Sequence, residues 1–327
     1  MKVALTGAAG HLGAAILQEL TGRNIPVKAL IRDHDARSCA GLPVEIIKGD
    51  MLHQGVLSNL MQGCDTVIHS AALISVNGDP KGLVQQTNVS GTQLAVDTAL
   101  HCGVKRFVHI SSIHAYQQKP SLAILDEQRQ PVTEQAFAYD RSKQAGKKIA
   151  LAANGQAMEV IVVHPTSIIG PYDFKPSMMG NVIMGLYNGK LPFIFNGGFD
   201  FCDCRDVAGA VVNALTMGSP GEAYILSGKW YSLTQLAGFL SAAAQKKINP
   251  FALSLTAAKL GLPVIKLLAT LQKKEPLYTI EALDALFTGN RMISSEKART
   301  ALGYTNRPFE ETIDDTFHWF KNNGYLD

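Results

Sequence analysis

Short apolar runs alternate with longer helical patterns over the first half of the chain, and this order constrains the fold more than any other feature. The runs are KVALT, VKALI, VEIIK, TVIHS, RFVHIS and EVIVVHP. Each is continuously apolar, which is typical of parallel strands that are covered on both faces. Helical patterns lie from about residue 10, near 55–62, across 81–102 and at 139–154. The pattern predicts an α/β fold with a Rossmann-type, doubly wound parallel sheet.

The segment TGAAGHLG places three glycines, Gly7, Gly10 and Gly13, directly after the first strand and at the start of a helix. Glycine allows a tight turn and close approach to a pyrophosphate, and the helix N-terminus offers free N–H groups. The spacing differs from the commonest Rossmann fingerprint. Glycines also end strands for steric reasons alone, but the repeated strand and helix pattern favours a dinucleotide site.

The end of the second strand, VKALIRD, bears on which dinucleotide binds. NAD usually meets an acidic residue there, but Ile31 stands at that position and Arg32 follows it, with Arg37 nearby. A guanidinium suits a 2′-phosphate, so NADP(H) is favoured. A solvated arginine is the alternative, and Asp33 keeps NAD(H) possible. After the third strand, Asp50 is a candidate acceptor for the adenine amino group.

The segment YDRSK contains a tyrosine and a lysine whose spacing suits acid–base chemistry. Tyr139 and Lys143 are four residues apart in a helical pattern, so their side chains share one face. An ammonium beside a phenol favours the phenolate, so we expect Lys143 to lower the pKa of Tyr139. Such pairs also arise on exposed helices. The preceding strand ends in HISS, which supplies Ser111 and Ser112 as hydroxyls that would orient a carbonyl.

Nine segments in this order resemble the extended short-chain dehydrogenase/reductases over nearly the whole chain: TGAAGHLG, GDM, VIHSAA, TNVSGT, VKRFVHISS, YDRSK, HPTSIIGP, CDCRDVAGAV and SSEKARTALGY. The resemblance implies about seven parallel strands that bind the dinucleotide along their carboxyl ends. It implies Ser112 as the catalytic serine, with Ser111 sent toward the opposite face. The catalytic set is then Ser112, Tyr139 and Lys143, with hydride transfer at the nicotinamide and Tyr139 protonating the nascent alkoxide.

The same resemblance implies where the cofactor lies. Ala71 and Ala72 would line it at the fourth strand, Pro165 and Thr166 would lie by the nicotinamide, and Lys143 would hold the nicotinamide ribose. Together with the motifs, the expected cofactor-binding residues are Gly7, Gly10, His11, Leu12, Gly13, Arg32, Arg37, Asp50, Met51, Ala71, Ala72, Lys143, Pro165 and Thr166.

Two positions argue against a nucleotide-sugar substrate. Phe199 stands where sugar-nucleotide members of the family commonly carry an arginine, and Ile113 with His114 stands where the dehydratases tend to be acidic. This favours the branch that resembles dihydroflavonol 4-reductases and 3β-hydroxysteroid dehydrogenases. We expect an NADP(H)-dependent oxidoreductase for a carbonyl or secondary alcohol of a small to medium apolar substrate. The alternatives are a nucleotide-sugar epimerase or dehydratase with bound NAD, and an NADP(H)-sensing regulator without turnover.

The alternation of strand and helix patterns is interrupted after residue 170, and a helix from Val207 and the strand AYILS follow later. We expect residues 1–170, rejoined by about 200–230, to form the dinucleotide-binding domain and 171–327 to form mainly a smaller α/β substrate-binding lobe. Candidate substrate residues are His114, His164, Tyr172 and Met178, accompanied by Phe174, Met179, Met184, Phe193 and the apolar stretch 251–271. Such residues are more often core than pocket, and lone histidines near strand ends are more often structural.

Composition argues against several other classes. The net charge of +3, from 30 Lys+Arg and 27 Asp+Glu, provides no field for a polyanion, so no nucleic-acid partner is expected. Five cysteines lack a C-x-x-C spacing, which predicts neither a disulfide framework nor a metal site and favours a reducing, cytoplasmic location. Cys202 and Cys204 are expected to pack in the interior.

No integral membrane segment is expected. The stretch 251–271 is interrupted by Lys259, Pro263 and Lys266, and its apolar runs are far shorter than the ~18 residues of a span. The N-terminus is predicted to be a strand rather than a signal peptide. The expected partner is a small-molecule substrate, and the resemblance implies a possible homodimer through the helices near 81–102 and 139–154.

Overall fold

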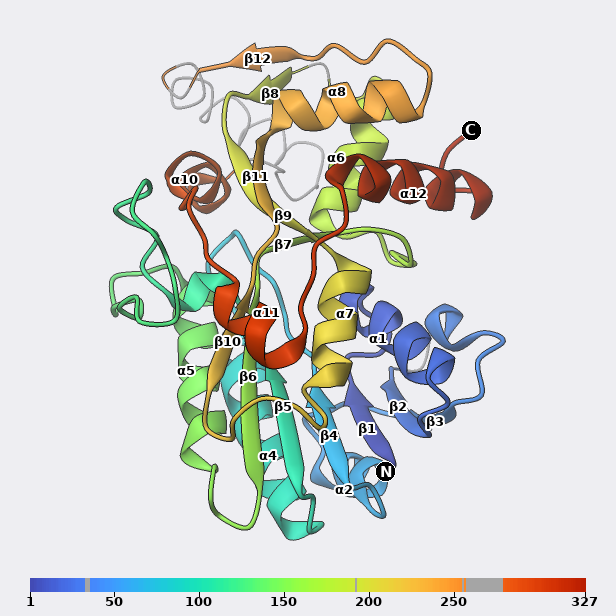
Figure 1. The fold of residues 1–327 in the computed structure, drawn as a ribbon, viewed down its shortest axis with the longest axis vertical. Helices are drawn as coiled ribbons and strands as arrows, with labels where there is room; N and C mark the ends of the chain where they lie inside the picture. The colour runs from blue at the N-terminus through green and yellow to red at the C-terminus, as the bar shows by residue number, and fades with distance from the viewer. Residues whose placement is uncertain (33–35, 192, 255, 257–278) are drawn as a thin grey trace.

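A sheet of seven parallel strands, in the order β10-β6-β5-β4-β1-β2-β3, forms the centre of the molecule (Figure 1). The computed structural model describes residues 1–32, 36–191, 193–254, 256 and 279–327. The strands are β1 (Val3–Thr6), β2 (Val27–Ile31), β3 (Glu45–Lys48), β4 (Thr66–His69), β5 (Arg106–Ile110), β6 (Glu159–Pro165) and β10 (Ala223–Leu226). The order reverses between β1 and β4, the switch point at which open α/β sheets bind ligands. The predicted Rossmann-type fold is confirmed.

Helices cover both faces of this sheet and bury one core on each side (Figure 1). The first core lies under α1 (His11–Gly22), α7 (Cys204–Asn213) and α11 (Glu296–Leu302), and the second under α2 (Gln54–Met61), α4 (Gly91–His101) and α5 (Ala138–Ala152). Strand β6 shows the alternation, because Ile161 and Val163 belong to the first core and Val160 and Val162 to the second. Both faces are therefore apolar, which explains the continuous apolar runs in the sequence.

Two helices differ from the sequence prediction. The helix expected over 81–102 consists of three successive pieces: α3 (Leu83–Gln85), the π-helical turn η2 (Gln86–Ser90) and α4. The helix expected from Val207 begins earlier, at Cys204. The cause is Asp203, whose Oδ1 accepts a hydrogen bond from the Arg205 main-chain N–H (2.8 Å). This side chain satisfies a first-turn donor that has no partner within the helix.

Two smaller sheets lie beyond the carboxyl ends of the main sheet, with the strand orders β11-β9-β7 and β12-β8 (Figure 1). Their strands are β7 (Ser167–Ile169), β8 (Phe193–Phe195), β9 (Gly198–Asp203), β11 (Lys229–Ser232) and β12 (Phe251–Leu253), and their helices are α6 (Met178–Tyr187), α8 (Leu233–Ala243), α10 (Ile280–Thr288) and α12 (Phe309–Asn322). A third core fills this layer. Of the apolar stretch 251–271, residue 255 and residues 257–271 lie outside the described residues. Among the helices of the described residues, none has the length and apolar character that a membrane span requires.

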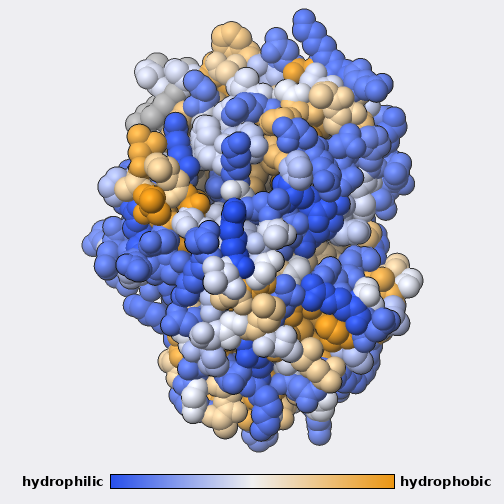
Figure 2. Space-filling model, in the orientation of Figure 1, coloured by the Kyte–Doolittle hydropathy of each residue, from blue (hydrophilic) through white to orange (hydrophobic). Residues whose placement is uncertain are grey.

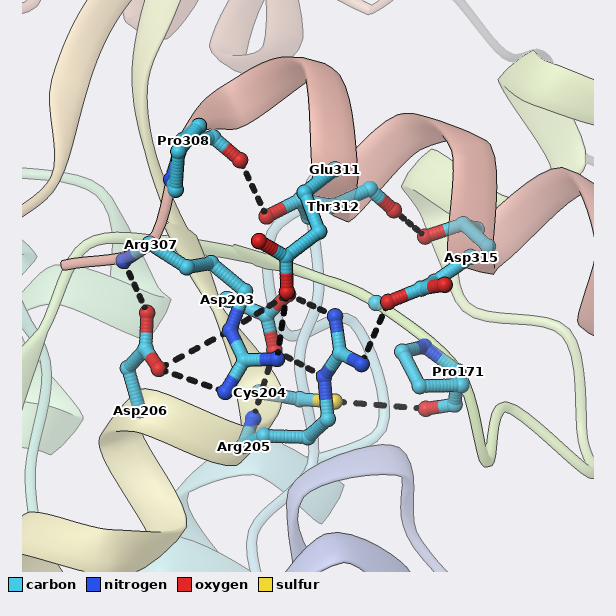
Figure 3. A network of polar contacts seen from close by, with 12 residues as sticks. Pro171, Asp203, Cys204, Arg205, Asp206, Arg307, Pro308, Glu311, Thr312 and Asp315 are labelled. Atoms are coloured by element: carbon cyan, nitrogen blue, oxygen red, sulfur yellow. Dashed lines mark hydrogen bonds and ion pairs between the residues drawn. The ribbon is translucent and has the colours of Figure 1, made fainter. Parts of the chain in front are cut away.

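A network of charged side chains joins α7 to the C-terminal helix α12 (Figure 3). The guanidinium of Arg205 lies 2.7 Å from Asp203 Oδ2 and 2.6 Å from Asp315 Oδ2 of α12. Arg307, just before α12, donates through Nε and Nη2 to Asp206 Oδ1 of α7 (2.9 and 2.8 Å). Burial opposes ionisation of Asp203, but hydrogen bonds from Arg205 outweigh it and hold the pKa of Asp203 below its usual range. We call this set of residues the C-terminal clamp.

Cys202 of β9 and Cys204 of α7 are buried in the first core, as the sequence predicted. Burial raises the pKa of both thiols, which keeps them protonated and apolar in character. Across the ranges that the structure describes, no three His, Cys, Asp or Glu side chains are arranged to hold a metal ion.

Candidate active site

The turn between β1 and α1 has no room for side chains at two of its glycines. Gly7 has a φ of +76°, and a Cβ on it would lie 2.6 Å from the nitrogen of Ala71 at the end of β4. A Cβ on Gly13 would lie 2.0 Å from the Gly7 carbonyl oxygen. The Gly10 N–H donates to the same oxygen (3.0 Å), and α1 begins at the next residue. Bare backbone followed by a helix N-terminus is what a pyrophosphate requires, so these residues fit a dinucleotide.

The residues expected at the adenosine end lie at the carboxyl ends of β2 and β3. Arg32 directly follows β2 and is exposed, and Arg37, in the short helix η1 (Arg37–Cys39), is exposed as well. The Arg37 guanidinium donates to the hydroxyl of Tyr325 (2.8 Å), so one of its N–H groups contacts the C-terminal segment. Asp50 accepts a 2.9 Å hydrogen bond from the main-chain N–H two residues later. Asp33, the argument for NAD, lies outside the described residues.

Five other predicted cofactor residues differ in how open they are. Leu12 and Met51 are buried, at 8% and 7% exposure, and they belong to the first and the second core respectively. Ala71 is partly buried and Ala72 is exposed, both directly beyond β4. Pro165 is buried as the last residue of β6. Ala71 and Ala72 therefore border open space, whereas Leu12 and Met51 support the site from within the cores.

Two further predicted residues, His11 and Thr166, are held in place by hydrogen bonds. His11 Nε2 lies 3.1 Å from the carbonyl oxygen of Gly170 and 3.0 Å from that of Pro171. Because carbonyl oxygens only accept, His11 Nε2 carries a proton. Thr166 donates through Oγ1 to Asp200 Oδ1 (2.7 Å). The start of α1 is thereby connected to the loop after β7, and the end of β6 is connected to β9.

Ser112, Tyr139 and Lys143 come together at the carboxyl end of β5. Tyr139 lies in the first turn of α5, and its side chain interacts with the Ser112 hydroxyl. Lys143, one turn further along α5, donates from Nζ to the carbonyl oxygen of Ile110, the last residue of β5 (2.8 Å). Ser111 donates to the Lys143 main-chain oxygen (3.2 Å), so its hydroxyl is engaged with the backbone of α5. The three predicted residues are adjacent.

Burial dominates the electrostatics of this group. It raises the pKa of Tyr139 to about 12, an effect that the Ser112 hydrogen bond reduces and the charge of Asp140 increases. It lowers the pKa of Lys143 to about 8. The expectation that Lys143 lowers the pKa of Tyr139 was wrong for this structure, because the ammonium binds the Ile110 carbonyl and the desolvation of the phenol outweighs charge effects. Tyr139 is protonated at neutral pH.

His114, a predicted substrate residue, lies beside Ser112 and Tyr139. Its ring is 6.0 Å from the ring of Tyr139, between centroids, in an edge arrangement. Its Nδ1 lies 3.1 Å from Asp140 Oδ1, and its side chain is 32% exposed. Its main-chain N–H donates to Ser112 Oγ (3.2 Å). His114 is thus a solvent-accessible imidazole at the edge of the set.

Two other substrate candidates lie elsewhere than predicted. His164 is fully buried, with its ring 4.8 Å from the ring of Tyr116, so its side chain does not face an open site. Tyr172, at a φ of +69°, packs against the first core and lines a cleft of about 480 Å³ between α1 and α7, which is lined by none of Ser112, Tyr139 and Lys143. Met178 opens α6 and is 42% exposed. Met179 and Met184 pack against the third core.

Sequence reasoning missed two polar groups next to the predicted catalytic residues. Asn88 of η2 accepts from the Leu73 N–H (2.7 Å) and donates to the Ser142 hydroxyl (2.9 Å), which links the loop after β4 to α5. Tyr116 accepts from Lys147 Nζ (2.8 Å). Both residues could have been found from the sequence. Asn88 lies in the segment TNVSGT, and Lys147 follows Lys143 by four residues, so the two lysines share one face of the helix.

Buried histidines lie on three neighbouring strands close to Lys143. His69 and His109 stack with ring centroids 5.6 Å apart, and His69 has hydrogen bonds to the Thr6 and Thr92 hydroxyls (2.9 and 3.3 Å). Neither ring nitrogen of His109 has a partner among the described residues. Burial lowers the pKa of His69 and of His164 to about 3, and that of His109 well below its ordinary value. These imidazoles are neutral at pH 7.

The free energy of unfolding is expected to fall as the pH drops below 6.5, the ordinary histidine pKa at which the unfolded chain takes up these protons. The folded pKa of His69 and His164 is about 3, so stability is full above pH 6.5 and is lost toward pH 3. Each histidine contributes a slope of up to ~1.4 kcal/mol per pH unit. Urea unfolding across this window checks the slope. His109→Leu should flatten it by about one proton, and equal slopes in both proteins would contradict the prediction.

Chains that combine a parallel-sheet switch point with a glycine turn closed to side chains are dinucleotide-binding proteins, and the fold and site assign this molecule to that class. Comparison with known protein families shows which family of dinucleotide-binding proteins this is. Residues 3–227 match the NAD dependent epimerase/dehydratase family, and the chain belongs to that family of extended short-chain dehydrogenase/reductases, as the motifs predicted. It is therefore an enzyme of a nicotinamide-dependent family.

Similar proteins extend over the whole chain. A putative dihydroflavonol 4-reductase of Synechocystis sp. is 30% identical over 332 residues, covering 98% of this chain and 95% of the relative. Sterol demethylase protein B of Methylococcus capsulatus is 28% identical over 331 residues, covering all of both chains. The crystal structure of gox2253 superposes with a TM-score of 0.84 at 28% identity, covering 100% of this chain and 99% of that one.

Proposed function

We propose that this chain is an NADP(H)-dependent oxidoreductase that transfers hydride between the nicotinamide and a carbonyl or secondary alcohol of a small to medium apolar substrate. One observation carries the proposal. Tyr139 is a partly buried, protonated phenol that interacts with the Ser112 hydroxyl and stands one helical turn before Lys143. A hydroxyl, a proton donor and a cation in this order are the groups that reduction of a carbonyl requires.

Each residue of the set has a separate task in reduction. The nicotinamide, when bound, supplies the hydride. Ser112 donates a hydrogen bond to the carbonyl oxygen and shares the negative charge that develops there. Tyr139 protonates this oxygen, because burial raises its pKa to about 12 and keeps its proton in place until an alkoxide forms. Lys143, with a pKa of about 8, remains charged at neutral pH and offsets the negative charge left on Tyr139.

The cofactor would be held by residues from several strand ends. Gly7, Gly10 and Gly13 would accommodate the pyrophosphate, since a Cβ at Gly7 or Gly13 meets backbone atoms. Thr166 would lie by the nicotinamide, with its hydroxyl fixed by Asp200. Arg32 supports NADP(H) over NAD(H), because it is exposed directly after β2, where no carboxylate precedes it.

Arg32→Ala is expected to weaken NADPH binding by about tenfold while NADH binding changes by less than about twofold. The reason is that only NADPH carries a 2′-phosphate, and a charge-assisted hydrogen bond contributes roughly 1.5–3 kcal/mol. Fluorescence titration of both cofactors measures the two dissociation constants. Arg23→Ala, at the exposed far end of α1, is the matched control and should leave both unchanged. A proportional loss for NADPH and NADH would remove the argument for NADP(H).

The apolar substrate class is supported by the aromatic side chains of β9 and by the names of two relatives. By the family resemblance, Phe199 stands where an arginine would bind a diphosphate, and its ring lies 6.0 Å from the Phe201 ring, between centroids. The names of the two curated relatives refer to a dihydroflavonol and a sterol. Within this proposal, residues 171–327 mainly bind substrate, the protein is cytoplasmic, and α4 and α5 are the helices of a homodimer.

Three assays on the purified protein test the function. Consumption of NADPH at 340 nm with a panel of apolar aldehydes and ketones is the expected result and supports the reductase. Release of NAD on denaturation, without NADPH consumption, would instead favour a nucleotide-sugar epimerase or dehydratase, as the family model also covers these enzymes. NADPH binding without turnover of any carbonyl would favour a sensor.

A further inference from the structure

His164 makes one directed hydrogen bond from a fully buried position. Its Nδ1 lies 2.9 Å from the main-chain oxygen of Ser112. A carbonyl oxygen only accepts, so the neutral ring carries its proton on Nδ1. Nε2 therefore bears the lone pair, and it has no hydrogen-bond partner in the part of the chain that the structure describes. The ring is thus oriented by its contact with Ser112 and by its packing.

The Ser112 carbonyl lies where the chain leaves the main sheet. The last residue of β5 is Ile110, and the Ser111 N–H still donates to β6 (2.8 Å). Beyond that point the Ser112 carbonyl accepts from the Ala115 N–H (3.0 Å) and from His164. Without the imidazole, only a short helical turn would hold this peptide group. Its orientation determines where the Ser112 hydroxyl points.

The imidazole is in turn held by the helix that carries the other two catalytic residues. The Tyr116 ring meets His164 edge-on, with centroids 4.8 Å apart and an interplanar angle of 62°. Lys147 of α5 donates to the Tyr116 hydroxyl (2.8 Å), and its ammonium lies 4.2 Å from the centroid of that ring. Lys147 follows Lys143 by one turn and Tyr139 by two, so all three share one face of α5.

We propose that His164 is a positioning residue. Its Nδ1–H holds the Ser112 peptide group so that the serine hydroxyl stays directed toward the Tyr139 hydroxyl. The Tyr116 ring packs against the imidazole, and Lys147 of α5 in turn holds Tyr116. This inference rests on the proposed function, since it assigns His164 a task only if Ser112 orients a carbonyl. It also explains why a histidine precedes Pro165 in the segment HPTSIIGP: the buried imidazole holds the main chain of Ser112 and does not contact substrate.

Two amide substitutions that differ by one methylene group separate positioning from simple burial. Asparagine places an N–H donor near the position of Nδ1, whereas glutamine places it near Nε2. With NADPH and the apolar aldehyde panel, His164→Gln is expected to lower kcat by up to about 100-fold with little change in KM for NADPH. His164→Asn should recover kcat to within a few-fold of wild type. His109→Leu, which removes a buried imidazole without hydrogen bonds, is the control and should keep kcat.

A double variant shows whether His164 acts through Ser112. In the Ser112→Ala background, adding His164→Gln should cause almost no further loss, because the group that it positions is absent. Multiplicative losses would overturn the inference while leaving the proposed function intact. If Ser112→Ala itself keeps full turnover, the proposed catalytic set fails, and the inference fails with it.

A readout without turnover tests the same hydrogen bond. Hydrogen exchange of the full-length protein, followed by mass spectrometry of peptides that span residues 111–117, reports opening of the turn after Ser112. We expect faster exchange in His164→Gln, and wild-type exchange in His164→Asn and His109→Leu. Equal exchange in all four proteins would overturn the proposal even for a chain that reduces none of the carbonyls in the panel.

Discussion

Tyr139→Phe is expected to lower kcat by about 1000-fold or more while NADPH still binds with wild-type affinity. Loss of a positioned general acid costs about 10²–10⁴-fold, and Tyr139 is the acid that interacts with the Ser112 hydroxyl. The phenyl ring keeps the volume and the apolar contacts of tyrosine, so the fold should not change. Stopped-flow measurement of NADPH oxidation, with fluorescence titration of NADPH, gives both quantities.

The matched control for this variant is Tyr304→Phe. Tyr304 is buried at 2% exposure, and its hydroxyl has no partner among the described residues, so removing that hydroxyl should leave kcat unchanged. A Tyr139→Phe enzyme that retains more than about a tenth of wild-type kcat would mean that another group protonates the alkoxide. His114, beside the Tyr139 ring, would then be the first residue to replace.

The second large effect is expected from Gly13→Ala, which should remove measurable NADPH binding. The new Cβ would lie 2.0 Å from the Gly7 carbonyl oxygen and 2.9 Å from the Ala8 Cα, and these are backbone atoms that a side-chain rotation cannot move away. Either the turn opens or α1 moves away from β1, and both changes disturb the backbone that a pyrophosphate would approach. Isothermal titration with NADPH measures the affinity, and circular dichroism shows whether the protein remains folded.

Gly22→Ala is the control for this substitution. Gly22 ends the same helix, and a Cβ there would meet nothing within 4 Å, so binding should be unchanged and stability equal or slightly greater. Wild-type affinity in Gly13→Ala would contradict a dinucleotide site at this turn.

The main sheet was readable from the sequence because its signal is local. Strands such as β1 and β6 are buried on both faces, so each appears as a continuous apolar run of its own. The strands β7 and β8 have three residues each and depend on partners far along the chain, and such short runs carry no distinctive period. The early start of α7 was readable in principle, since Asp203 is a favourable capping residue.

The site divides in the same way. Tyr139 and Lys143 share a face because helix geometry alone places them there. The raised pKa of Tyr139 required the three-dimensional structure, because desolvation depends on everything packed around the ring. Tyr172 was misplaced because it packs against the first core and lines the cleft between α1 and α7, and these contacts join residues far apart in the sequence. His164 was misplaced because Tyr116 and Lys147, distant in sequence, enclose it.

The C-terminal clamp has a consequence for how the chain is made. Asp206 and Arg205 at the start of α7 meet their partners 101 and 110 residues later. During synthesis the chain emerges from its N-terminus, so the central sheet and α7 are complete before Arg307 and Asp315 exist. Until then, the buried carboxylate of Asp203 lacks part of its compensating charge. A chain that ends before Arg307 would therefore have an assembled central sheet but would lack the contacts that join α7 to α12.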